Sequence, residues 1–189
     1  MRFEIEDMFA ASRAELEALL EDPELYPRMA RDLPGIERIE LLAQDEADGV
    51  VRRRVRYTPA GVDERLPAAA RGRLTPEMMV WVEESCFFRR EHRLEYRVEP
   101  NLPDKWRAKF TSRGEFTFAE VAGGVRRTIV GEVTVRMPLV GGLIERRLVQ
   151  ELRTSFRAEA ALLAGWLEER RAGSAGGARS RTAGAAAHQ

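Results

Sequence analysis

The spacing of apolar and polar positions changes near the end of the chain. From Val125 to Met137 apolar residues alternate with polar ones, which is the period of a β-strand. From Leu143 to Arg171 apolar residues recur on one helical face, at Leu148, Leu152, Phe156, Ala160, Leu163 and Leu167. The segment Pro138–Gly142, with its proline and glycine pair, separates the two patterns. A long amphipathic helix this late in the chain must bury its apolar stripe on a sheet formed earlier.

The preceding residues predict that sheet. Arg2–Met8 alternates as a first strand, and Ser12 with Glu15 three residues later forms a capping box that starts a helix. Asp22-Pro23 starts a second short helix, which ends at Leu33-Pro34-Gly35. Six further strands are predicted over residues 36–44, 50–58, 78–88, 91–99, 105–121 (with Gly114 as a bulge) and 125–137.

The predicted fold class is therefore α+β. A curved antiparallel sheet of about seven strands, in the order β-α-α-β6-α, wraps around a long C-terminal helix in a helix-grip fold, which often leaves a cavity between sheet and helix. We expect one domain over residues 1–171. Residues 172–189 are rich in Gly, Ala, Ser and Arg and lack an apolar period, so we expect a disordered tail there. The irregular loop Pro59–Pro76 is long enough to form a lid over the mouth of the cavity.

Two segments carry a resemblance to a known superfamily. The stretch from Ala11 to Pro27 resembles the opening of START-like (SRPBCC) proteins, which include Bet v 1-like proteins and polyketide cyclases. The stretch from Gly131 to Glu145 is similar to a bacterial, functionally uncharacterised branch of that superfamily. The resemblance implies the helix-grip fold, and it brings no catalytic motif that maps onto this chain. Its members include lipid carriers, cyclases, hydrolases and chaperone cofactors, so it implies no single activity.

Composition narrows the classes of function. Acidic and basic residues balance at 31 each, so no overall field favours nucleic acid or an anionic membrane. Cys86 is the single cysteine and reads as a small buried hydrophobe, and one of the two histidines, His188, lies in the expected tail. We expect no metal and no cofactor, because metal-ligand spacings are missing. The sequence shows no membrane-spanning or signal segment, so we expect a cytoplasmic protein; the oligomeric state stays open.

Several side chains are expected to face the concave side of the sheet. Arg53 shares the parity of Val51, Val55 and Tyr57, and its guanidinium suits a ligand carboxylate or phosphate, or an internal ion pair. Either Glu83 or Glu84 must face inward, and register decides which. The ligand-binding candidates are Arg53, Tyr57, Trp81, Glu84 (with Glu83 as the alternative), His92, Tyr96, Trp106, Phe110 and Phe116.

For His92 we favour a position near the Arg89-Arg90 turn, with the ring reaching solvent, over a role as a ligand-binding base. The backbone N–H groups of Gly141-Gly142 could hold an anion, but we favour a purely structural bend.

Three functions compete. We favour a non-enzymatic protein that binds or transports a small hydrophobic or amphipathic, lipid-like ligand between sheet and helix. The alternative from another class is a cyclase or hydratase that uses the inward glutamate, His92 and Tyr96 for acid–base chemistry. A third is an adaptor that binds another protein through the outer face of the sheet or the tail.

Overall fold

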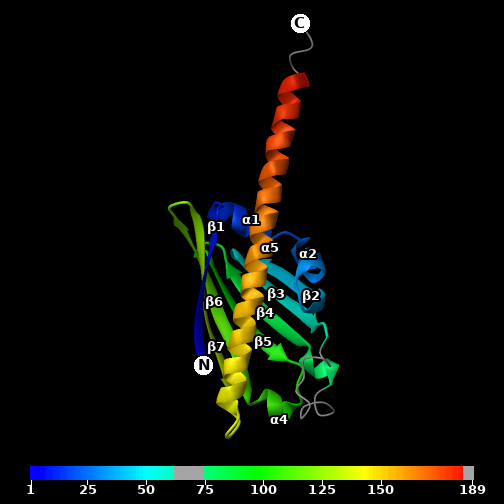
Figure 1. Cartoon of the computed structure of the whole chain (residues 1–189), viewed down its shortest axis with the longest axis vertical. Helices are drawn as coiled ribbons and strands as arrows, with labels where there is room; N and C mark the ends of the chain where they lie inside the picture. Colours follow the sequence, from blue (N-terminus) through cyan, green and yellow to red (C-terminus); the bar gives the residue numbers. More distant parts are fainter. Residues whose placement is uncertain (62–74, 185–189) are drawn as a thin grey trace.

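Seven antiparallel strands form one curved sheet around a long helix (Figure 1). The computed structural model describes residues 1–61 and 75–184, with side chains up to residue 173. The elements are β1 (Arg2–Phe9), α1 (Arg13–Leu20), α2 (Leu25–Asp32), β2 (Ile36–Ala47), β3 (Val50–Pro59), η1 (Pro76–Met79), β4 (Trp81–Phe88), β5 (Arg93–Pro100), α4 (Asp104–Arg107), β6 (Phe110–Val121), β7 (Gly124–Val135) and α5 (Gly141–Gly184). The strand order is β1-β7-β6-β5-β4-β3-β2, and α5 crosses the concave face. The predicted fold class is confirmed.

The turn into α5 depends on its first glycine. A Cβ on Gly141 would lie 2.3 Å from the backbone oxygen of Val135, so a larger residue does not fit there. The helix starts two residues before the predicted Leu143 and continues past Arg171 to Gly184. We expected a tail from residue 172, but this segment holds no proline, and its alanine and arginine residues favour helix. The division into a domain of residues 1–171 and a tail stays a prediction, and residues 185–189 lie outside the described residues.

Three predicted strands, β4, β5 and β6, begin later than expected, and short helices precede β4 and β6. The residues before Trp81 form the 3-10 helix η1, and the residues before Phe110 include the short helix α4. In α4 the amides of Trp106 and Arg107 both donate to the carbonyl of Pro103, which removes Trp106 from the strand. Gly114 is no bulge, because β6 and β7 pair without interruption. Most of the predicted loop Pro59–Pro76 lies outside the described residues.

The predicted helix caps form at the other end of the sheet. Ser12 accepts a hydrogen bond from the amide of Glu15, and the Glu15 carboxylate accepts one from the amide of Ser12 at 2.7 Å. The second helix begins at Leu25, later than the predicted Asp22-Pro23, and the Asp22 carboxylate accepts a hydrogen bond from the amide of Glu24 at 2.8 Å. α1 and α2 lie against the middle of α5 in Figure 1, and the helix projects beyond them.

Burial is uneven along the inner face. α5 packs mainly against β7, and to a smaller extent against β1 and α1. On that side the inner residues are buried: Phe3, Ile5, Ile129, Val133 and Val149. On β4, β5 and β6 the inner aromatic residues Trp81, Phe110 and Phe116 are half-buried, although Phe87, Tyr96 and Phe118 on the same strands are buried. Part of the inner face is therefore less completely covered than the rest.

Candidate ligand site on the inner face

Strand parity places Arg53 inside. Along β3 the side chains of Val51, Arg53, Val55 and Tyr57 are buried, whereas the arginines between them are exposed. The Arg53 guanidinium donates to the Gln44 side-chain oxygen at 3.0 Å and to the Leu20 carbonyl at 3.1 Å. A buried guanidinium needs such partners, and here a neighbouring strand and the end of α1 supply them.

The inward glutamate is Glu83, so the choice of Glu84 was wrong. Glu84 lies on the outer face, where its carboxylate contacts Arg54 at 3.0 Å and Arg97 at 2.8 Å. The register decides this, because Glu83 lies opposite Val55 on β3 and Val98 on β5. Both of these are on the inner parity, and side chains alternate strictly along a strand.

The Glu83 carboxyl on the inner face has a strongly raised pKa. Burial and the Glu159 carboxylate on α5 together raise its pKa to about 7, although Arg53 acts in the opposite direction. Such a group exchanges a proton near neutral pH, which suits either a ligand partner or a general acid–base catalyst.

Aromatic side chains surround Glu83. Tyr57 and Trp81 stack with ring centroids 5.2 Å apart. Tyr96 contacts Phe116, which in turn contacts Phe156 of α5, in edge-to-face pairs at 5.5 and 5.6 Å. We call this set the inner aromatic patch, and it consists of Tyr57, Trp81, Glu83, Tyr96, Val98, Phe116 and Phe156.

Tyr96 adds a polar group to this patch. Its side chain is 5% exposed, and its hydroxyl has no hydrogen-bond partner among the described residues. Burial raises the pKa of Tyr96, as it does for Tyr57, so both are neutral phenols at physiological pH. The ring lies over Gly114, where a Cβ would come within 2.6 Å of it.

A buried ion triad lies beside the patch. Arg127 on β7 is fully buried and donates to Asp7 on β1 at 2.8 Å and to Glu159 on α5 at 2.5 Å. Its guanidinium also lies 5.4 Å from the ring centroid of Phe116. Burial alone would lower the pKa of Arg127, but the two carboxylates outweigh it and raise that pKa. The sequence analysis missed this residue, although its parity with Val125 and Ile129 was a signal.

Three other candidates lie outside the patch. His92 is in the turn before β5, where its φ is 51° and its Nδ1 lies 2.8 Å from Glu17. The structure places His92 in this turn, as we preferred from the sequence. Trp106 is half-buried on α4, and Phe110 packs at the start of β6 against the buried cluster around Phe3. Cys86 is half-buried on the outer parity of β4 rather than buried.

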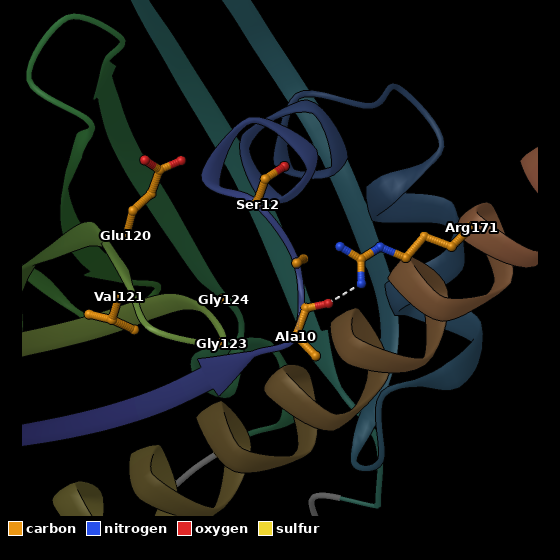
Figure 2. Close-up of a pocket in the computed structure, with 8 residues that line it drawn as sticks. Ala10, Ser12, Glu120, Val121, Gly123, Gly124 and Arg171 are labelled. Carbon is orange, nitrogen blue, oxygen red and sulfur yellow. Dashed lines mark hydrogen bonds between the residues drawn. The ribbon is translucent and has the colours of Figure 1, made fainter.

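Two surface pockets lie at the α1 and α2 end. One, of about 580 Å³, is lined by Ala10, Ala11, Ser12, Glu120, Val121, Gly123, Gly124 and Arg171 (Figure 2). There Arg171 donates to the Ala10 carbonyl and also pairs with Glu15 at 2.8 Å. The second, of about 540 Å³, lies between α2 and Trp166 of α5. Neither lies between the inner aromatic patch and α5, so the predicted cavity stays a prediction.

The described residues offer neither a metal site nor a membrane-spanning helix. Among residues 1–61 and 75–184 no cluster of three His, Cys, Asp or Glu has the geometry to hold a metal ion. Within the same ranges, every helix is too short or too polar to cross a bilayer.

The fold is the helix-grip fold of the START-like proteins, as the resemblance implied. The chain belongs to the family described as "Protein of unknown function (DUF2505)", whose model matches residues 4–167. No curated protein matched the sequence.

Solved structures share this fold at low identity. The Zhui aromatase/cyclase from a Streptomyces species is 16% identical with a TM-score of 0.62, over 90% of this chain and 94% of that one. Norcoclaurine synthase from Thalictrum flavum is 15% identical with a TM-score of 0.61, over 90% and 96% of the chains. A START superfamily protein from Mycobacterium smegmatis is 15% identical with a TM-score of 0.54, over 89% and 97%. At these identities the likeness shows the fold alone.

Proposed function

We propose that this protein binds a small amphipathic ligand between the inner aromatic patch and α5. The observation that carries the proposal is the uneven burial of the inner face. Residues beside β1 and β7 are buried, whereas Trp81, Phe116 and Phe156 remain half-buried next to the polar groups of Glu83 and Tyr96. Ligand sites combine apolar lining with a few polar groups in this way.

Two of these polar groups can orient a ligand. The hydroxyl of Tyr96 is unpartnered among the described residues, and an unsatisfied buried donor is unfavourable unless something accepts from it. Glu83 has its pKa raised to about 7 by burial. An apolar ligand body with one polar end satisfies both the aromatic surface and these two groups.

A binding titration tests the proposal, with tryptophan fluorescence as the signal because Trp81 belongs to the patch. The ligands are linear C8 to C12 compounds with different head groups. We expect saturable binding that Val98→Trp abolishes, because the larger ring fills the space next to Glu83. Glu99→Trp, one residue further on the outer face of the same strand, is the matched control and should bind normally. A fluorescence change that does not saturate, or equal binding by both variants, would overturn the proposal.

Acid–base catalysis of the cyclase or hydratase kind is the second candidate. The raised pKa of Glu83 favours it, since a carboxyl that titrates near 7 both accepts and donates protons at physiological pH. Among the structural relatives, the Zhui protein is described as an aromatase/cyclase. Conversion of a poly-β-carbonyl substrate that Glu83→Gln abolishes, with ligand binding retained, would support catalysis over binding alone.

A further inference from the structure

Among the described residues, each charged side chain of the inner face has a polar partner within the protein except one. Arg127 is paired with Asp7 and Glu159. Arg53 is occupied by Gln44 and the Leu20 carbonyl. Glu83, by contrast, makes no hydrogen bond or ion pair with any residue in the part of the chain that the structure describes.

The register shows what surrounds that carboxyl. Its direct neighbours across the sheet are the aliphatic Val55 and Val98, and Trp81 lies two residues before it on the same face. Charged or titratable groups reach it electrostatically from four elements: Arg53 and Tyr57 on β3, Tyr26 on α2, Tyr96 on β5 and Glu159 on α5. The three tyrosines are neutral, so of the side chains that the structure describes only Arg53 opposes the negative charge.

The charge balance of this region is therefore acidic. Within the described ranges, two guanidinium groups, Arg53 and Arg127, face three carboxyls, Asp7, Glu83 and Glu159. An ionised carboxylate in an apolar setting is unfavourable without a cation. The rings of Tyr57 and Trp81 stack on each other beside it, and the outer face of an aromatic stack attracts an ammonium group. An anionic head group would instead meet the like charges of Glu83 and Glu159.

We propose that the ligand of the inner aromatic patch is an amphipathic amine, whose protonated nitrogen pairs with the Glu83 carboxylate while its apolar body lies on the aromatic rings. This inference rests on the proposed function and specifies the ligand class. It differs from the expectation that Arg53 would receive a ligand carboxylate, because the Arg53 guanidinium already has its partners inside the protein.

Three ligands of the same chain length show which head group the site prefers. They are n-octylamine, n-octanol and octanoate, each titrated into the full chain at pH 8. We expect the amine to bind about tenfold or more tightly than octanoate. Glu83→Gln should remove this preference, and Glu84→Gln, its neighbour on the outer face, should keep it. Calorimetry at pH 7 in buffers of different ionisation enthalpy should show a release of about half a proton per amine bound, since pairing ionises Glu83.

The outcomes are distinct. If none of the three ligands binds, the proposed function itself fails and the inference fails with it. If they bind with octanoate equal to or tighter than octylamine, or if Glu83→Gln retains the amine preference, the inference alone is overturned. Circular dichroism of both variants confirms that they are folded before binding is compared.

Discussion

Asp7 and Arg127 are direct partners across the pairing of β1 with β7, and the Arg127 guanidinium donates to the Asp7 carboxylate through both Nε and Nη2, at 3.1 and 2.8 Å. Glu159 of α5 accepts from the same guanidinium at 2.5 Å. These three residues come from the first strand, the last strand and the last helix. The triad therefore fixes the helix to the sheet at one defined position.

Breaking this triad should destabilise the fold strongly. Arg127→Met keeps much of the side-chain volume but leaves two carboxylates buried without their cation. We expect a loss of about 3–5 kcal/mol in the free energy of unfolding, measured by urea denaturation. Asp7→Asn leaves the Arg127–Glu159 pair and should lose less.

The control for that experiment is the residue that directly precedes Arg127 on β7. Arg126 is exposed, and its contact with Glu6 is 3.9 Å long. Arg126→Met should change stability by no more than about 0.5 kcal/mol. A comparable loss for both variants would show that the buried triad has no special role.

Glu83 predicts an unusual pH dependence of stability. Its pKa is about 7 in the folded protein and near 4.5 in the unfolded chain. Between these values the folded state holds one more proton than the unfolded state, so stability falls as pH rises through this window. The contribution is at most about 3 kcal/mol. Urea denaturation of the wild type from pH 5 to 8 should show this decrease.

Glu83→Gln isolates this effect from other titrating groups. Its amide cannot ionise, so the stability difference between variant and wild type should grow in favour of the variant from pH 5 to 7 and level off above. Glu15 titrates in another range, because its hydrogen bonds with Arg171 and Ser12 lower its pKa to about 2. A difference that is flat with pH would contradict a raised pKa for Glu83.

The fold could be predicted from sequence because its signals are local. The change of period around Pro138–Gly142 and the Ser12–Glu15 capping box each depend on residues a few positions apart. The errors in the fold came at element ends, where Pro103 nucleates the single turn of α4 and displaces Trp106 from the strand. A window dominated by alternating aromatic residues does not reveal such a turn.

The site was harder to predict because it depends on long-range pairing. Whether Glu83 or Glu84 faces inward follows from the register of β4 with β3 and β5, which no local pattern sets. Arg127 was overlooked for a different reason: a charged residue on an otherwise apolar parity is acceptable only with partners, and these are on β1 and α5. Both residues require the assembled sheet.

Gly114 should be intolerant of even one methyl group. A Cβ there would lie 2.6 Å from the Tyr96 ring and 2.7 Å from the Val130 backbone oxygen. We expect Gly114→Ala to destabilise the protein by about 1–3 kcal/mol. Gly165 is a matched contrast in the middle of α5 with nothing within 4 Å of its Cβ position, so Gly165→Ala should stabilise by about 0.5–1 kcal/mol. If thermal denaturation showed that both variants gain or both lose stability, the difference in packing between Gly114 and Gly165 would be contradicted.

The positions of Trp81 and His92 predict that only the first of them affects ligand binding. Trp81 stacks on Tyr57 within the patch, so Trp81→Leu keeps an apolar side chain but removes the aromatic face. We expect it to weaken octylamine binding roughly tenfold, as measured by calorimetry. His92 lies in the turn before β5 and contacts Glu17 of α1, outside the patch, so His92→Gln should leave the dissociation constant unchanged. A loss of binding in His92→Gln with none in Trp81→Leu would move the ligand site to the β4–β5 turn and away from the concave face.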